Sequence, residues 1–433
     1  MEKYLYEQNI HWGHELYAAG IEREQLTAIM ALIEIDQVIA ITGIRRCGKS
    51  YLLKQIANQL ISNGVPRENI LLLNLELPSF GSEGSNRILD TIIELYLRLK
   101  NPEGRLYIFL DEIQTISEWE IWLKYNYDQK KGKLKFFITG SNSGLLSSEF
   151  ASRLSGRIIE KLLFPFSFKE YLTARDYTGF SNQELSNNKQ QILHYLDQYM
   201  EYGGMPELLN VKQVEVKREL LLSYFNTIIF KDIIARYSLR NNQVVPKLAL
   251  FLLSNSSSLL NIKKLADYLR ISKREVLRDY LDYLEQVYLN FVICKFDYSL
   301  KVQLLSQKKG YCIDNGFVNL LPLRFSQNQG KQLENLVFLE LKRRGNKVYY
   351  YQKNGYECDF IVFDLLQEPG AYQVCHEINE NTRKREITGL LAGCQKLGIT
   401  SGSIITFEQE DEEIIDGVKI STIPYWKWVL TSI

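Results

Sequence analysis

Short apolar runs alternate with longer stretches of helical pattern in the first third of the chain. The four runs read QVIAIT, NILLLNLEL, RLYIFLDE and LKFFITG, at residues 37–42, 69–77, 105–112 and 134–140. Continuous apolar runs of this length are typical of strands that are buried on both faces of a sheet. The pattern therefore predicts an α/β fold in which helices cover both faces of a parallel sheet.

The pattern changes after Pro165, and we expect four regions in the whole chain. The first, residues 1–170, contains the parallel sheet, and residues 171–245 form a helical linker. Residues 246–320 show two helices, a β-prone stretch, a basic loop (SQKKG) and a short strand, which is the order of elements in a winged helix. Residues 321–433 alternate helix with strand and predict a small α/β domain.

The composition excludes few classes of protein. The 433 residues carry a net charge of +1, so we expect no overall electrostatic attraction to nucleic acid or membrane. No apolar run reaches the roughly 18 residues that suggest a membrane span. The six cysteines form no CxxC pair, so a structural zinc site is not expected. These features predict a cytoplasmic protein with reduced thiols and no membrane attachment.

The segment GIRRCGKS at residues 43–50 fits the pattern G-x-x-x-x-G-K-[ST] of a phosphate-binding loop. It follows a predicted strand and opens a predicted helix, as phosphate binding requires. Two glycines let backbone N–H groups turn toward the phosphates, and the N-terminus of the helix adds its dipole. Lys49 would reach the β- and γ-phosphates, and Ser50 would hold Mg²⁺. The expected ATP contacts are Gly43, Ile44, Arg45, Arg46, Cys47, Gly48, Lys49, Ser50 and Tyr51.

A later predicted strand, LYIFLDE, ends in two carboxylates. Asp111 would hold Mg²⁺, mainly through water, and Glu112 would orient and deprotonate the water that attacks the γ-phosphate. The next strand ends in Ser141 and Asn142. A polar side chain at that point could contact the γ-phosphate as a sensor, and an ordinary polar turn is the alternative.

Two arginines follow in the segment ASRLSGR. Arg153 and Arg157 are four residues apart and lie on one face if the segment is helical. Either could be an arginine finger for a neighbouring subunit in a homo-oligomer. A solvated basic turn is the alternative.

A series of motifs then identifies a resemblance. The phosphate loop with its paired arginines is followed in order by FLDEIQ, TGSNSGLL, RLSGR, FPFSFKEY, YGGMPE, VLRDYLDYLEQ, YCIDNG and ECDFIV. Together these motifs resemble the prokaryotic AAA-type ATPases that join an Orc/Cdc-like P-loop domain to a C-terminal domain of unknown function. The resemblance covers roughly residues 20–390 and implies an extended AAA-type sheet, a winged helix, a nuclease-like terminal domain and ATP hydrolysis. It places Ser141 at the sensor position, and Arg153 or Arg157 at the finger position.

The terminal region resembles a PD-(D/E)xK nuclease core, in which carboxylates from a helix and a hairpin hold Mg²⁺ and a lysine stabilises the attacking water. Glu334 on the predicted helix, with Glu357 and Asp359 in ECDFIV, would supply the acids. The next strand should read like I-E-V-K, but it carries Gln373 and Cys375 instead. Glutamine binds metal weakly, and a thiol that is mostly neutral near pH 7 cannot supply a fixed positive charge.

Lys353 on the preceding hairpin could replace the missing lysine, although the spacing does not require it. We therefore expect a vestigial nuclease site at Glu334, Asp359 and Gln373, in a domain that is used for binding or docking. A working nuclease is the less favoured alternative.

The winged helix is the expected DNA contact. Lys273, Arg274 and Arg278 lie near the start of its second helix, and Lys308 and Lys309 lie on the predicted wing. Phosphate contacts need mobile cations, and a helix in the major groove supplies them near its N-terminus. A solvated helix in a joint between domains is the alternative.

These features predict an ATPase that uses ATP and Mg²⁺ and whose nucleotide state controls the binding of DNA or of a protein partner by the C-terminal domains. One alternative is a metal-dependent nuclease that ATP gates. The other is a nucleotide-dependent switch that recognises a protein partner.

Overall fold

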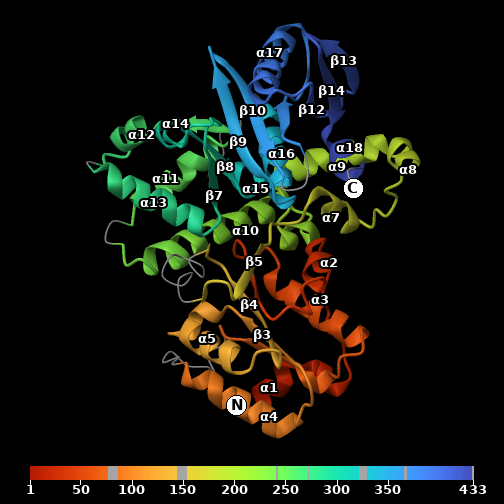
Figure 1. Ribbon diagram of the computed structural model, residues 1–433, viewed down its shortest axis with the longest axis vertical. Helices are drawn as coiled ribbons and strands as arrows, with labels where there is room; N and C mark the ends of the chain where they lie inside the picture. The colour runs from red at the N-terminus through yellow and green to blue at the C-terminus, as the bar shows by residue number, and fades with distance from the viewer. Residues whose placement is uncertain are drawn as a thin grey trace. The chain divides into compact units, whose positions relative to one another are not determined.

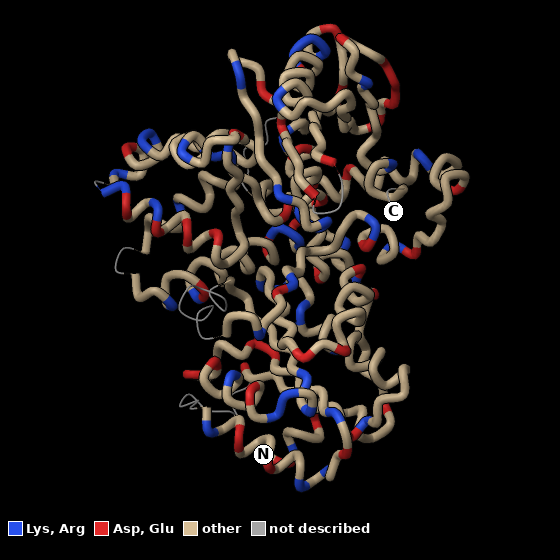
Figure 2. Tube along the Cα trace, viewed as in Figure 1, with Lys and Arg blue, Asp and Glu red and all other residues tan. Residues whose placement is uncertain are grey.

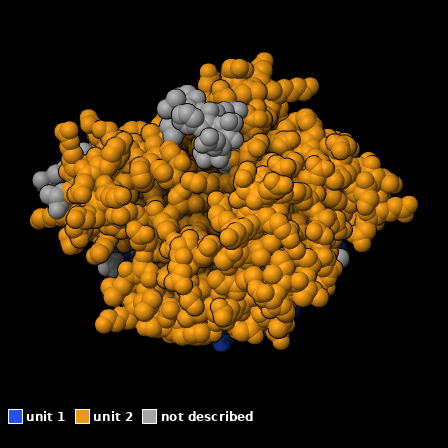
Figure 3. Space-filling model, turned by 90° about the horizontal axis from the view of Figure 1, so that it is seen from above, with its two compact units in different colours: residues 1–164 blue, residues 165–433 orange. Residues whose placement is uncertain are grey.

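The computed structural model describes residues 1–76, 86–143, 154–239, 242–271, 273–320, 329–364 and 368–431. The chain divides into two compact units, Met1–Phe164 and Pro165–Ile433 (Figures 1 and 3). The boundary lies a few residues before the predicted one at residue 170, since Pro165 already begins the second unit. The further division of the second unit into three regions stays a prediction.

The first unit is built on a five-stranded parallel sheet with the order β2-β3-β4-β1-β5. The four apolar runs form four of its strands, so the predicted parallel sheet is confirmed. The strands are β1 Val38–Thr42, β2 Ile70–Asn74, β3 Leu106–Asp111, β4 Leu134–Gly140 and β5 Ile158–Leu162. The sequence did not predict β5, because Glu160 and Lys161 interrupt its apolar pattern and the strand is only half-buried at the edge of the sheet.

Helices cover this sheet, as the alternation of apolar runs predicts. In β1, Val38 and Ala40 contribute to a core with the helices α4 and α5, whereas Ile39 and Ile41 are equally buried outside that core cluster. The helix α3 packs on β3 and β4. The helical segments of the unit are α1 Glu2–Gln8, η1 Ile10–Gly13, α2 Gln25–Met30, α3 Lys49–Ser62, η2 Arg67–Asn69, α4 Arg87–Lys100, η4 Ile113–Thr115 and α5 Trp119–Gln129.

The N-terminal segment covers the outer edge of β2 with side chains instead of a further strand. Asn9 Nδ2 donates to Leu72 O at 3.0 Å, and Leu72 N donates back to Asn9 Oδ1 at 2.7 Å. Trp12 Nε1 and a ring nitrogen of His11 both contact Ile70 O. An edge strand normally presents unpaired backbone groups, and here the side chains of this segment satisfy them. Burial lowers the pKa of His11 to about 4, so this imidazole is neutral near pH 7.

The second unit begins with helices. They are α7 Phe168–Thr173, α8 Asn182–Asn187, α9 Lys189–Tyr202, η6 Pro206–Asn210, α10 Val214–Thr227, the π-helix η7 Ile228–Ala235 and α11 Val244–Ser254. This agrees with the helical character predicted for residues 171–245. The π-helix continues α10 and buries Ile228, Ile229 and Ile233.

A three-stranded antiparallel sheet follows, with the order β6-β8-β7. The two predicted helices lie between its first and second strands in the sequence, and the first strand, β6, was not predicted. The elements are β6 Ser258–Leu260, α12 Ile262–Tyr268, α13 Arg274–Gln286, β7 Asn290–Ile293, α14 Leu300–Leu305 and β8 Lys308–Cys312. The basic stretch SQKKG is not the predicted loop, because Lys308, Lys309 and Gly310 pair with β6 and β7 as part of β8.

The chain ends in a six-stranded mixed sheet with the order β13-β14-β12-β11-β10-β9. The short helix α15 Asn315–Val318 and the helix α16 Gln329–Arg343 precede it. Its strands are β9 Lys347–Lys353, β10 Tyr356–Phe363, β11 Gly370–Val374, β12 Ser401–Thr406, β13 Asp411–Ile415 and β14 Val418–Pro424. The helix α17 Glu380–Leu397 crosses between β11 and β12, and α18 Tyr425–Thr431 closes the described chain.

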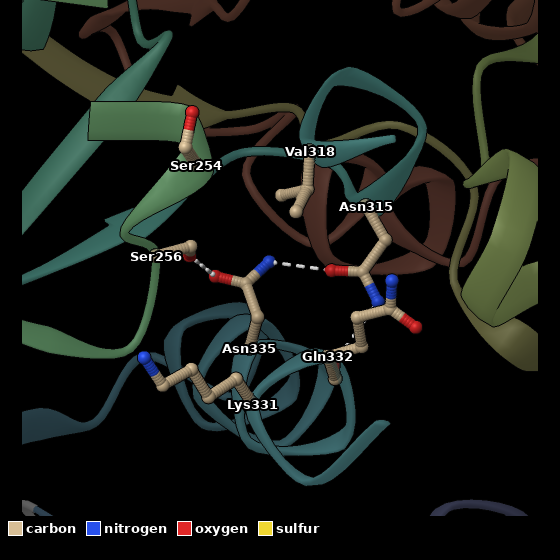
Figure 4. A pocket seen from close by; sticks show the side chains of 7 residues that line it. All are labelled: Ser254, Ser256, Asn315, Val318, Lys331, Gln332 and Asn335. Atoms are coloured by element: carbon tan, nitrogen blue, oxygen red, sulfur yellow. Dashed lines mark hydrogen bonds between the residues drawn. The ribbon is translucent and has the colours of Figure 1, made fainter. Parts of the chain in front are cut away.

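A buried polar cluster joins α16 to the three-stranded sheet and to α15. Asn335 on α16 accepts from Ser256 Oγ at 3.0 Å, and its amide donates to Asn315 Oδ1 at 2.9 Å (Figure 4). Its oxygen also accepts from Cys312 N at 2.9 Å. The small cavity beside it has a volume of about 10 Å³, which is about the room one water molecule needs. Both the oxygen and the nitrogen of the Asn335 amide thus have partners, and a fully satisfied buried polar group favours one arrangement of the elements around it.

None of the described helices is long and apolar enough to cross a membrane. All six cysteines are reduced, and all except Cys294 are buried.

We expect Asn9→Leu to loosen the outer edge of the first sheet. The leucine keeps most of the volume but leaves the N–H and C=O of Leu72 buried without partners, which costs about 2–4 kcal/mol in the free energy of local unfolding. Native-state hydrogen exchange of the β2 amides measures the loss. Glu7→Leu, at an exposed neighbouring position, is the matched control, and unchanged protection of β2 in Asn9→Leu would contradict the role given to Asn9.

Candidate nucleotide site and acidic centre

The loop between β1 and α3 has the backbone that a phosphate-binding loop needs. Gly43, Arg46 and Gly48 have φ values of 151°, 70° and 104°. A Cβ atom on Gly43 would lie 2.3 Å from Leu163 O, so only glycine fits there. The helix α3 begins at Lys49, directly after Gly48. The local sequence therefore places a helix N-terminus at the end of the loop.

Lys49 lies folded over this loop. Its ammonium group donates to Gly43 O at 3.1 Å and to Ile44 O at 3.2 Å, and it lies 3.7 Å from Glu112 Oε1. The side chain is only 4% exposed. The ammonium group thus lies between the loop carbonyls and the carboxylate of Glu112, the residue that directly follows β3.

Asp111 lies at the C-terminal end of β3 with two hydroxyl donors. Thr139 Oγ1 donates to Asp111 Oδ1 at 2.5 Å, and Ser50 also donates a hydrogen bond to this carboxylate. Burial raises the pKa of Asp111, and these two hydrogen bonds act in the opposite direction. Ser50 and Asp111, the two residues expected to hold Mg²⁺, are therefore in direct contact, and their oxygen atoms are ligands of the kind Mg²⁺ prefers.

Thr139 is a functional candidate that the sequence interpretation missed. Besides binding Asp111, its hydroxyl accepts a hydrogen bond from Glu112 N at 2.9 Å. It is fully buried on β4, the strand that lies between β1 and β3. The signal was present in the sequence, since Thr139 is a polar residue near the end of an apolar strand.

Glu112 is held in an unusual conformation. Its φ of 56° lies in the left-handed region, where a residue other than glycine is strained. Strained residues of this kind are frequent at functional sites. Gln114 Nε2 donates to Glu112 Oε2 at 2.5 Å, and Lys49 faces the other carboxylate oxygen. The structure therefore orients the Glu112 carboxylate from two sides, and Gln114 is a second residue that the sequence interpretation did not single out.

Arg23 connects the phosphate-binding loop to the end of the first unit by two hydrogen bonds. Its guanidinium donates to Cys47 O and to Phe164 O, both at 2.7 Å, and the side chain is buried. The thiol of Cys47 is fully buried, and burial raises its pKa. No motif pointed to Arg23, because its two contacts lie 24 and 141 residues away in the sequence.

The segment before Arg23 packs on α3 beside the loop. Gln55 Nε2 donates to Ala19 O at 2.8 Å and to Ile21 O at 2.6 Å. Between them, a Cβ atom on Gly20 would lie 3.4 Å from the ring of Tyr51. Tyr51, an expected ATP contact, is 50% exposed, so its ring is accessible next to this segment.

The remaining residues predicted for this site have mixed positions. Arg45 forms an ion pair with Glu76 at 3.4 Å, and Arg46 is exposed. Ser141 is buried just after the end of β4. Arg157 binds both carboxylate oxygens of Asp128, at 2.8 and 3.1 Å. Arg153 lies outside the described residues.

The predicted acidic residues of the second unit do come together, but around a lysine. Lys309 Nζ lies 2.7 Å from Glu334 Oε1, 2.6 Å from Glu357 Oε1 and 3.1 Å from Asp359 Oδ1. The expectation that Lys309 lies on a wing open to DNA is therefore wrong, because its side chain is 4% exposed. Gln373 donates to Glu386 at 2.6 Å and accepts from Asp359 N at 3.2 Å. We call Lys309, Glu334, Glu357 and Asp359 the acidic centre.

The charges of this centre are strongly coupled. Burial raises the pKa of Glu334, and Lys309 acts against this effect. Burial alone would lower the pKa of Lys309, but Glu334, Tyr311 and the two other acids raise it well above its usual value. Lys309 is therefore a fixed positive charge at neutral pH.

The acidic centre does not fit the Mg²⁺ that the nuclease resemblance implies. The ammonium group of Lys309 already occupies the position at which the three carboxylates converge. Within the described ranges, no group of three or more histidine, cysteine, aspartate or glutamate side chains is arranged to hold a metal ion. Lys353, the predicted replacement for the nuclease lysine, is exposed at the end of β9.

The residues predicted to contact DNA lie on the surface. Lys273, Arg274 and Arg278 are all exposed at the start of α13. A cavity of about 400 Å³ opens beside them, and Lys247 and Arg270 line it together with Lys273. Its described lining contains no acidic residue, although acidic and basic residues are interspersed elsewhere along both units (Figure 2).

The chain matches two protein families and is similar to proteins of other organisms. The AAA domain family matches residues 36–172, and a domain of unknown function, DUF8612, matches residues 193–329. The uncharacterized protein MJ1544 of Methanocaldococcus jannaschii is 33% identical in a match of 414 residues, and the match covers 92% of this chain and 89% of that protein. The chain belongs to the same family as MJ1544. Its first unit carries an AAA domain of the P-loop ATPase type, as the sequence predicted.

Other similarities are more distant. An uncharacterized protein of Haemophilus influenzae is 29% identical over 419 residues, covering 94% of this chain and 98% of that protein. A RuvB variant of Thermotoga maritima aligns with a TM-score of 0.30 and 15% identity, over 67% of this chain and 89% of that chain. The Aeropyrum pernix ORC1 protein in complex with DNA gives a TM-score of 0.28 and 11% identity, over 69% and 91%. With TM-scores this low, the fold rests on the sheet order of the AAA domain and on the family match.

We expect Thr139→Val to lower ATP turnover about 10- to 100-fold, because the substitution keeps the shape but leaves Asp111 and the Glu112 amide without their shared partner. Release of inorganic phosphate by the purified full chain measures the effect. Thr139→Ser keeps the hydroxyl and should retain most of the turnover. Wild-type turnover in Thr139→Val would show that this hydrogen bond does not position the site.

Proposed function

We propose that this protein hydrolyses ATP in its AAA domain and that the nucleotide state controls how its second unit binds DNA. The observation that carries the first part is the contact between Asp111 and Ser50 beside the ammonium group of Lys49. It brings the groups needed for Mg²⁺ and phosphate binding together at one end of the parallel sheet.

The proposed roles follow from these positions. Lys49 and the loop N–H groups bind the phosphates, and Ser50 and Asp111 hold Mg²⁺, which neutralises charge on the β- and γ-phosphates when it is bound. Glu112 orients the attacking water and accepts its proton. Gln114 and Thr139 act as positioning residues, because each binds Glu112 or Asp111.

Arg23 supports the proposed link between nucleotide and second unit. Its guanidinium joins the loop carbonyl of Cys47 to Phe164, the residue after which the second unit begins. Leu163 N also donates to Thr42 O at 2.8 Å, at the entry to the loop. A change in the loop on hydrolysis would therefore reach the segment that leads out of the AAA domain.

The order of α11, β6, α12, α13, β7 and β8, with the sheet order β6-β8-β7, supports a winged helix. DNA is the favoured partner because the described lining of the cavity beside α13 has three cations and no acidic residue. Phosphate groups of a duplex provide the complementary charge.

A protein partner is the second candidate, and the connection between β7 and β8 favours it. Tyr298, Leu300, Leu304 and Leu305 on and beside α14 are between 67% and 77% exposed. Large apolar side chains that gather on one exposed segment are typical of protein contacts.

For the finger, we propose Arg153 over Arg157. Arg157 is engaged by both oxygens of Asp128 and would have to break this pair to reach a neighbouring subunit.

Glu112→Gln should bind ATP normally but lose turnover by about 10²- to 10⁴-fold, since the amide cannot accept the proton of the attacking water. Lys49→Ala should lose nucleotide binding as well as turnover. Fluorescent nucleotide titration and phosphate release separate the two effects. The catalytic assignment fails if Glu112→Gln turns over ATP at the wild-type rate.

We expect the triple variant Lys247→Ala, Arg270→Ala, Lys273→Ala to bind duplex DNA more weakly. The slope of log K against log salt should fall by roughly three, because each lost phosphate contact releases about one counterion fewer. Fluorescence anisotropy at several salt concentrations measures both quantities, with ATP and with ADP.

The matched control is Lys3→Ala, Lys131→Ala, Lys133→Ala, which removes the same charge from exposed positions of the AAA domain. Equal DNA binding by wild type and by the first triple variant, or no DNA binding at low salt, would transfer the proposal to a protein partner that docks on α14.

A further inference from the structure

The acidic centre is assembled from three elements that are distant in the sequence. Lys309 comes from β8 of the three-stranded sheet, Glu334 from α16, and Glu357 and Asp359 from β10 of the six-stranded sheet. One oxygen of each acid lies within 2.6–3.1 Å of Lys309 Nζ. The lysine therefore reaches across from one sheet of the second unit to the other.

Two of the three acids, Glu334 and Asp359, are held in place by other groups as well. Tyr311 OH donates to Glu334 Oε1 at 2.7 Å, and Val374 N donates to Asp359 Oδ2 at 2.9 Å. Gln373 Oε1 accepts from the backbone N–H of Asp359. The Glu334 and Asp359 carboxylates are thus oriented by hydrogen bonds that do not involve Lys309.

From this geometry we propose that the Lys309 ammonium is the resident cation of the acidic centre, in the position that Mg²⁺ would take in a nuclease of this topology. The order α16, β9, β10, β11, α17, β12 supports the nuclease-like topology. The inference does not depend on ATP hydrolysis, since it concerns the second unit alone.

Charge and space both support the substitution. A divalent cation needs several oxygen ligands at about 2.0–2.6 Å, and here the same oxygen atoms already surround the ammonium nitrogen of Lys309, whose side chain is 4% exposed. An ammonium group donates three hydrogen bonds, which matches the three acceptors. A second cation placed beside it would meet direct repulsion in a site that is almost closed to solvent.

The centre therefore binds two sheets together and does not cleave a phosphodiester. The position expected for the nuclease lysine is occupied by Cys375, whose thiol is buried and whose pKa burial raises. Lys309 on β8 supplies a positive charge to the acidic centre. Its ammonium group lies at the position of the metal, however, and not beside the attacking water, where the nuclease lysine would lie.

The test compares metal binding by the nucleotide-free full chain in a Ser50→Ala background, which weakens the phosphate-loop metal site. Mn²⁺ binding is followed by electron paramagnetic resonance, and thermal unfolding is measured with and without Mn²⁺. The protein with Lys309 intact should bind no Mn²⁺ at the acidic centre, so adding Glu357→Gln should not change its Mn²⁺ binding. Mn²⁺ should also leave its unfolding temperature unchanged.

Lys309→Met should lower the unfolding temperature, because three carboxylates, two of them buried, are left without their cation. It should bind one Mn²⁺ at least about tenfold more tightly than wild type, and Mn²⁺ should restore its unfolding temperature. A further Asp359→Asn should abolish the gained site. Lys353→Met removes an exposed lysine from the neighbouring strand and should behave as wild type.

If Lys309→Met does not fold, the double variant Lys309→Met, Glu334→Gln should recover folded protein, because it removes one of the unpaired charges. Either that recovery or folding of the single variant in Mn²⁺ supports the proposal. Mn²⁺ binding by wild type that is lost in Glu357→Gln would overturn it. So would a Lys309→Met variant with wild-type stability and no gain in Mn²⁺ affinity.

Discussion

The insertion of β4 between β1 and β3 is the constraint on which the nucleotide site depends. Parallel strands end at the same edge of a sheet, so the order β3-β4-β1 sets the Asp111 carboxylate two strands away from the phosphate loop. Thr139 at the end of β4 then fills the space between them and binds both the carboxylate and the Glu112 amide. Without this strand the loop and the two acids would meet at a shorter distance, with no hydroxyl between them.

The features predictable from the sequence are those that depend on neighbouring residues. The glycine pattern of the loop fixes its backbone, and the apolar runs of β1 to β4 are long enough to identify buried parallel strands. The contact between Ser50 and Asp111 could be anticipated because both follow such strands. The helix before β7 was also predictable, since Leu277, Leu281 and Leu284 repeat at helical spacing in α13.

The features that escaped prediction depend on contacts between distant parts of the chain. Nothing near Arg23 in the sequence indicates that its guanidinium supports the loop and Phe164. The stretch KKG at residues 308–310 was predicted to be a basic loop exposed to solvent. Only the approach of α16 and β10 makes Lys309 a buried cation. The fifth strand, β5, was not predicted because its sequence mixes apolar and charged residues. An edge strand does not need a continuous apolar run.

The covering of β2 by the N-terminal segment affects how the AAA domain can be isolated. The family match begins at residue 36, and a fragment cut there would lack Asn9, His11 and Trp12, which satisfy the outer edge of the sheet, and Arg23, which supports the loop. The exposed strand would carry Leu71, Leu72 and Leu73 in a row, a segment of high β-propensity without charge. Such a fragment would tend to self-associate through strand pairing, so the smallest autonomous AAA domain of this protein includes the residues that precede its recognisable motif.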